Sequence, residues 1–255
     1  MEPLEEILKR LVAEMPDPDQ RGMYCTDIDA EKINEAIADM RKLGRDGVLG
    51  LIDMIVEPLE GDDVTPVKAK YALHCLAVHL CTIDDENARR QFCLTLASQL
   101  GGNRPKGVQG YLVQELQTAG GKEVVPALGK LLTDPVLCEP AAGALVAIGD
   151  GAAEQLRSAL RRAAGKCRLT MIQNLGVVGD AASIPSLRKA VGNTNAGIRM
   201  AAAWALANIG DEGAVDLLLE AAGASKGWER IQLTKACLLL AEKLQAGSTK
   251  TAAGV

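Results

Sequence analysis

Gly-Asp, preceded by a β-branched residue, recurs in the second half of the chain as Ile148-Gly149-Asp150, Val178-Gly179-Asp180 and Ile209-Gly210-Asp211. The second and third copies each follow the one before at nearly the same distance along the chain. Self-similarity at such an interval is typical of stacked repeats, each of which is too small to bury its apolar face alone. The interval therefore predicts a repeat fold, which specifies a surface more than it specifies a chemistry.

The Gly-Asp pair has a physical reason to recur where one helix ends and the next begins. Glycine ends a helix because it adopts positive φ without a Cβ penalty. Aspartate accepts hydrogen bonds from the free N–H groups of the next helix, and its charge suits that helix end. We therefore predict a structural capping role, and no catalytic role, for these residues: Gly149, Asp150, Gly179, Asp180, Gly210 and Asp211.

The composition favours helices throughout. Hydrophobic residues make up 48% of the 255 residues, yet the chain has only two Trp, three Tyr and one Phe. The core must therefore be built from Ala, Leu, Val and Ile, and Ala and Leu favour helix strongly. Few segments alternate apolar and polar residues as a half-buried strand would. We predict an all-α solenoid of about six antiparallel helix pairs behind an N-terminal helical cap.

Apolar spacing and breaker residues divide the chain into three parts. Residues 1–44 are the predicted cap, with one helix at 2–14, a linker at about 15–26 and a second helix from about 29. Residues 45–245 form the solenoid, and residues 246–255 are a predicted disordered tail because they are rich in Gly, Ser, Thr and Ala. The predicted pairs are 46–57 with 66–81, 85–100 with 105–118, 123–133 with 136–148, 151–163 with 166–178, 181–191 with 196–209, and 212–223 with 227–245.

The second helix of the fifth pair reads Ile198-Arg199-Met200-Ala201-Ala202-Ala203-Trp204-Ala205-Leu206-Ala207-Asn208-Ile209-Gly210-Asp211. This stretch resembles the short HEAT-like repeat of the phycobilisome-lyase type, V-R-x-x-A-A-x-A-L-G-x-I-G-D. First helices that open with Val125-Pro126 and Ile184-Pro185 match the I-P-x-L opening of that family. The resemblance covers about 122–216 and fades toward both ends, where terminal repeats commonly depart from consensus.

The resemblance implies a right-handed superhelix, with first helices on the convex side and second helices on the concave side. It also suggests enzymes to compare. Deoxyhypusine hydroxylase uses this repeat with His-Glu dipeptides, and the chain contains none, which excludes that activity. HEAT-like DNA glycosylases need a basic concave surface with exposed aromatics. The chain has only a few residues of these types that could serve there: Trp204, Trp228, Arg199 and Arg230. The bilin lyases use the same solenoid, so a chromophore-handling role stays open.

Charge and cysteine content restrict the class of protein further. The net charge is −5, with 17 acids and 7 bases in residues 1–63 and 16 acids and 21 bases in residues 64–255. This distribution lacks the concentrated basic charge of a dedicated nucleic-acid binder. Seven cysteines without a CxxC pair indicate buried thiols in a reducing compartment. Because the N-terminus is not signal-like and no apolar run is long enough for a membrane span, we expect a cytoplasmic protein that does not cross a membrane.

Residues with catalytic or metal-binding chemistry are few. Cys75 and His79 share a helix face, as half of a zinc site would, but no second half-site is visible. Cys138 stands where the repeat consensus has Arg, near a helix start that can activate a thiol; a small buried filler is the simpler interpretation. We therefore predict no catalytic residues, no bound metal and no cofactor.

What remains is the predicted inner surface of the second helices. The helical period directs several residues toward it, and we predict that they bind a partner: Arg168, Gln173, Arg199, Met200 and Trp204. Trp and Arg are enriched at binding hot spots. The alternative is that Trp204 packs between repeats while Arg168 and Arg199 pair with nearby acids.

The sequence thus predicts a non-catalytic protein–protein interaction scaffold that binds a protein or peptide segment along the concave helix face. One alternative is an accessory or lyase-like subunit that handles a chromophore or cofactor. A third is weak binding of nucleic acid or another acidic polymer by the basic C-terminal body.

Overall fold

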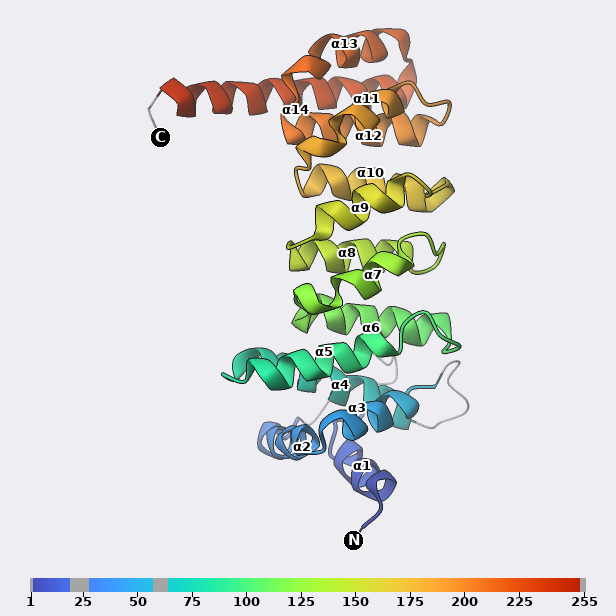
Figure 1. Ribbon diagram of the computed structural model, residues 1–255, viewed down its shortest axis with the longest axis vertical. Helices are drawn as coiled ribbons and strands as arrows, with labels where there is room; N and C mark the ends of the chain where they lie inside the picture. Colours follow the sequence, from blue (N-terminus) through green and yellow to red (C-terminus); the bar gives the residue numbers. More distant parts are fainter. Residues whose placement is uncertain (1, 19–27, 57–63, 253–255) are drawn as a thin grey trace. The chain divides into compact units, whose positions relative to one another are not determined.

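The computed structural model describes residues 2–18, 28–56 and 64–252 (Figure 1). Within these ranges the chain forms 14 α-helices and three 3-10 turns, and no β-strand. The prediction of an all-α solenoid with six helix pairs is confirmed. The chain divides into two compact units, residues 1–128 and 129–255. Most of the predicted linker at 15–26 and of the loop between the first two paired helices lies outside the described residues.

The first unit begins with two helices that pack against the first helix pair. The bounds are α1 Leu4–Ala13, α2 Ala30–Lys42, α3 Gly44–Asp53, α4 Thr65–Thr82, α5 Glu86–Ser98, α6 Lys106–Ala119 and the 3-10 turn η1 Lys122–Val124. α1 contacts α2, α3 and α4, and it buries Leu8, Leu11 and Val12 on one stripe. These contacts cover the apolar side that α3 and α4 would otherwise expose at the end of the stack.

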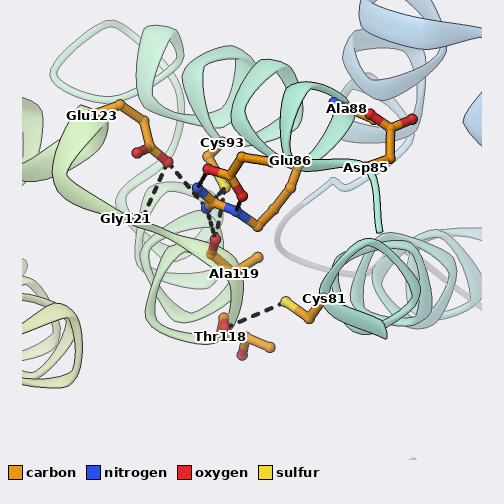
Figure 2. Close-up of polar contacts among 10 residues, drawn as sticks. Cys81, Asp85, Glu86, Ala88, Cys93, Thr118, Ala119, Gly121 and Glu123 are labelled. Atoms are coloured by element: carbon orange, nitrogen blue, oxygen red, sulfur yellow. Dashed lines mark hydrogen bonds and ion pairs between the residues drawn. The ribbon is translucent and has the colours of Figure 1, made fainter. Parts of the chain in front are cut away.

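Arg89 of α5 connects α5 to the end of α6 and to η1, at the corner between α6 and η1. Its Nε and Nη2 donate to Glu86 at 2.7 and 2.6 Å, and its Nη1 donates to Glu123 at 3.1 Å and to the Ala119 carbonyl. Figure 2 shows Glu86, Glu123 and the Ala119 carbonyl converging there from three segments. One guanidinium thus satisfies a helix-end carbonyl and fixes the turn that leads into the next helix.

The second unit repeats the helix pair more regularly. α7, Val125–Leu131, spans the division between the units. The remaining bounds are α8 Cys138–Ile148, α9 Ala152–Leu160, α10 Gly165–Val177, η2 Ala181–Ser183, α11 Ile184–Val191, α12 Ala196–Ile209, η3 Glu212–Ala214, α13 Val215–Ala224 and α14 Gly227–Ala252. The second helices α8, α10, α12 and α14 pack each against the next, and α9, α11 and α13 pack against their partners (Figure 1).

The last helix extends into the segment for which the sequence predicts a disordered tail. α14 continues through residues 246–252, and residues 253–255 lie outside the described part. A helix that is already nucleated extends at little cost, even through residues of lower helix propensity.

α10 and α12 approach each other closely at Gly176. A Cβ on this glycine would lie 2.6 Å from the Ala205 Cα and 3.1 Å from the Trp204 Cζ3. The Asn208 side chain donates to the Gly176 carbonyl at 2.5 Å across the same contact. Because the neighbouring atoms include backbone, no side-chain rotation makes room for a larger residue here.

The glycines of the three Gly-Asp pairs behave as predicted. Gly149, Gly179 and Gly210 have φ of 77°, 68° and 82°, each at the end of a second helix. The left-handed region admits glycine without strain, which explains its position at each corner.

The aspartates do not cap the next helix through their side chains, so this part of the prediction is wrong. Asp211 instead accepts two hydrogen bonds from Arg188, at 2.7 and 2.6 Å, and Asp180 pairs with Arg157. The arginine precedes its aspartate by the same sequence distance in both cases. A guanidinium offers a nearly buried carboxylate stronger hydrogen bonds than one backbone N–H does.

Asp150 differs from the other two aspartates. It is exposed, and Gly151, not Asp150, is the residue before α9. The position equivalent to Arg157 and Arg188 holds Ala127, which cannot form the ion pair. The corner at Asp150 instead contains two glycines with positive φ, Gly149 at 77° and Gly151 at 76°.

We expect Gly176→Ala to lower the free energy of unfolding by about 1–3 kcal/mol, since an added Cβ overpacks the α10–α12 contact. Gly223→Ala in α13 is the matched control, because nothing lies within 4 Å of its added Cβ. That variant should be neutral or stabilising, as Ala is the better helix former. Urea denaturation measures both changes, and equal effects of the two substitutions would contradict the packing argument.

The ion pairs at the corners predict an asymmetry among the aspartates. Asp211→Asn should lower the melting temperature, because it removes the charge that holds Arg188. Asp150→Asn should leave it nearly unchanged, because Asp150 is exposed. Thermal melts followed by circular dichroism at low and moderate salt compare them; a larger loss for Asp150→Asn would refute the assigned pairing.

Candidate partner-binding groove

A groove of about 620 Å³ lies on the second helices of the second unit. α10, α12 and α14 supply its walls, which are mostly apolar. Lys235 is the one charged side chain among the described residues that line it. The lining residues are Leu169, Gln173, Gly197, Met200, Ala201, Trp204, Trp228, Gln232, Lys235, Ala236 and Leu239.

Both tryptophans of the chain line this groove. Trp204 has its ring edge against Gly176 and is still 39% exposed, while Trp228 is 66% exposed. Trp204 therefore combines both roles considered from the sequence, since it packs between repeats and also offers surface. Large, partly exposed aromatic rings in an apolar groove are the side chains that commonly dominate binding energy.

The structure brings three of the five predicted residues together. Gln173, Met200 and Trp204 all line the groove. They come from consecutive second helices, as the repeat pattern predicts. Their spacing along α10 and α12 places them on one face.

Arg199 does not line the groove and has a structural role instead. Its Nε and Nη2 donate to Glu229 of the last helix pair at 2.5 and 2.8 Å. Its Nη1 donates to the carbonyls of Asn193 and Thr194 at 2.7 and 2.9 Å. The pairing raises the pKa of Arg199 and lowers that of Glu229. All three guanidinium nitrogens are used, so Arg199 joins repeats and is not a free contact for a partner.

Arg168 also lies outside the groove. It lines a separate pocket with residues of α9 and α11, although its neighbour Leu169 lines the groove. Of the five residues predicted to share one partner-binding surface, Arg168 and Arg199 therefore do not line the groove that contains Trp204. Adjacent positions at the start of α10 face different surfaces, since successive helical residues differ by about 100°.

α14 also contributes to the groove, which the repeat pattern did not predict. Trp228, Gln232, Lys235 and Leu239 recur at steps of one helical turn, which puts them on one helix face. This spacing was visible in the sequence. The departure of the last repeat from consensus hid its equivalence to α12.

Buried ionisable groups occur in the first unit, away from the groove. Glu115 of α6 is 3% exposed, and His74 Nδ1 lies 3.1 Å from its Oε2. Burial raises the pKa of Glu115, and the charge and hydrogen bond of His74 oppose that shift. Within the ranges the structure covers, no three His, Cys, Asp or Glu side chains are grouped as a metal site requires.

The cysteines for which the structure gives positions are all free thiols. Cys138 is fully buried, which fits a packing role better than a reactive one. Burial raises the pKa of Cys93 to about 12 and, together with a hydrogen bond involving Cys138, that of Cys167 to about 11. Thiols with such pKa values are poor nucleophiles at neutral pH.

The family comparison agrees with the repeat geometry. Residues 153–237 match the family model described as HEAT repeats. This range runs from α9 into α14 and includes the two Gly-Asp corners that carry Arg–Asp pairs, so the predicted HEAT-like repeats are confirmed there. No curated protein sequence matches the chain significantly. Among the described helices, none is long and apolar enough to cross a membrane.

Three solved structures are similar at low sequence identity. An engineered protein is 19% identical over 95% of this chain and 98% of its own, with a TM-score of 0.38. Human deoxyhypusine hydroxylase in complex with glycerol is 17% identical over 95% and 97%, with a TM-score of 0.34. The complex of CpcE and CpcF of phycocyanin lyase from Nostoc sp. PCC7120 is 18% identical over 94% and 95%, with a TM-score of 0.36. Similarity at this level assigns no activity to the chain.

The raised pKa of Glu115 predicts how stability depends on pH. A carboxyl that holds its proton more tightly when folded stabilises the fold below its ordinary pKa of about 4.5 and loses that contribution as pH rises through the folded value. Glu115→Gln should therefore flatten the fall in melting temperature above pH 4.5. The exposed Glu35→Gln is the control, and thermal melts from acidic to neutral pH that change equally in both variants would contradict the argument.

Proposed function

We propose that the chain is a non-catalytic interaction scaffold that binds a peptide segment of another protein in the groove formed by α10, α12 and α14. The observation that carries the proposal is the presence of Trp204 and Trp228, from two different helices, in one apolar groove. Apolar grooves on helix faces commonly receive amphipathic segments whose side chains insert at regular intervals.

The lining supports a particular kind of segment. Met200 and Leu239 offer adaptable apolar contacts beside the two indole rings. Gln173 and Gln232 can pair with backbone amides, and the Lys235 ammonium favours a carboxylate. The proposed partner segment therefore has one or two large apolar side chains and an acidic residue near them.

The tryptophans provide a direct test, because the chain has no others. Peptides are selected from a displayed library against the full chain, and each is titrated while indole emission is recorded. A bound apolar segment should shift the emission to shorter wavelength. Gln173→Ala and Met200→Ala should weaken binding, and Trp204→Ala should weaken it by at least about tenfold in a label-based assay.

Leu219→Ala is the matched control, because Leu219 of α13 is 56% exposed and does not line the groove. It should leave the dissociation constant within about twofold of the original. Selected peptides that leave the indole emission unchanged, or that lose equal affinity in Trp204→Ala and Leu219→Ala, would place binding elsewhere. Either result would reject the groove as the partner site.

A further inference from the structure

A second pocket of the second unit, separate from the groove, has an unusual charge. It has a volume of about 290 Å³ and lies between the end of α9, the first turn of α10, the 3-10 turn η2 and α11. Among the described residues that line it, every ionisable side chain is basic. The lining residues are Arg157, Leu160, Arg161, Arg168, Ala182, Ser183, Ser186 and Lys189.

Only one of these four cations is neutralised by the fold. Arg157 pairs with Asp180, the aspartate of the Gly-Asp corner. No ion pair joins Arg161, Arg168 or Lys189 to any acid in the described part of the chain. The Nε of Arg168 is buried, and within the residues described it has no hydrogen-bond partner. A buried guanidinium N–H without an acceptor is unfavourable, so the site favours a ligand that supplies one.

The equivalent arginine of the next repeat has the hydrogen-bond partners that Arg168 lacks within the described residues. Arg168 and Arg199 stand at the same place relative to the Gly-Asp corner of their own repeat, so they are equivalent. Arg199 is fully used by Glu229 and two carbonyls. In the preceding repeat, the equivalent residue is Cys138. The repeat therefore does not require an arginine at this position, and where the next repeat has one, protein groups bind all its nitrogens.

The other two cations are also particular to this repeat. The equivalents of Arg161 and Lys189 in the next repeat are Gly192 and Glu220. The equivalent positions in the next repeat therefore have neither of these two positive charges and have one negative charge, that of Glu220. Because the stack forms there without these cations, packing does not explain their convergence on one pocket.

We propose that this pocket binds a phosphate group, either as inorganic phosphate or as a phosphomonoester of a small molecule. Two guanidinium groups present paired N–H donors that match phosphate oxygens, and the Lys189 ammonium adds a third charge. A phosphate group near neutral pH carries nearly two negative charges, which suits three cations with no acid partner better than a single carboxylate does. The hydroxyl of Ser186, which also lines the pocket, is a further donor.

The test measures binding of inorganic phosphate to the full chain by calorimetry, in a chloride buffer of low ionic strength. Saturable binding at one site is expected, and Arg168→Gln should raise the dissociation constant at least tenfold. Arg162→Gln is the matched control, because Arg162 is an exposed neighbour that does not line the pocket. Circular dichroism checks folding, and Arg161→Gln and Lys189→Gln, at exposed positions, replace Arg168→Gln if that variant is unfolded.

Parallel titrations with glycerol phosphate and acetate separate the possible sources. Tighter binding of glycerol phosphate would identify the ligand of the pocket as a phosphomonoester, and tighter binding of inorganic phosphate would identify it as the free ion. Acetate should bind at least tenfold more weakly than either. Acetate binding as tight as phosphate, absence of saturable binding, or equal losses in the pocket variants and in Arg162→Gln would overturn the proposal. The indole emission of the groove should not change, which separates this site from the peptide site.

Discussion

Burial of small side chains between consecutive second helices is the constraint on which the second unit depends. At Gly176 and Ala205 the backbones of α10 and α12 come so close that one added carbon atom meets a Cα at 2.6 Å. The buried face of α12 accordingly consists mostly of alanine. Small residues bury little area each, so the stability of such a stack is the sum of many interfaces between neighbours and not the product of one large core. The Trp204 ring lies beside the same contact and is 39% exposed.

Polar contacts at the corners are secondary to this packing but set its register. Arg157–Asp180 and Arg188–Asp211 are the same ion pair in two repeats, and each joins a first helix to the corner that follows its partner helix. A third pair, between α12 and the last hairpin, links neighbouring repeats. The outward positions of each repeat are free to differ, and the basic pocket and the groove lie at such positions. Shared packing with local differences in surface chemistry is how one repeat type serves different ligands.

Much of the fold could be predicted from the sequence because its signals are local. Helical apolar spacing and glycine corners located the helices of the first five pairs to within about four residues, as the bounds of α12 illustrate. The positive φ of Gly210 followed from the same reasoning. The aspartates were misassigned because the competing guanidinium lies on an earlier helix, and no local rule indicates that Arg188 turns toward Asp211. The extension of α14 to Ala252 has no local sequence signal, because residues 246–252 include Gly, Ser and Thr, which have low helix propensity.

The site was only partly predictable for a related reason. The groove residues of α10 and α12 share a face that the helical period defines. The contacts of an arginine side chain depend instead on which acidic groups other helices place near it. Arg168 and Arg199 occupy equivalent positions, yet their fates differ because only one of them meets a carboxylate from the following pair. Because Glu229 belongs to a different hairpin, repeats of this chain are not interchangeable units. A recombined chain with the α11–α12 hairpin duplicated would set a copy of Ile198 where Glu229 now faces Arg199, and the second unit would lose a junction that no sequence consensus records.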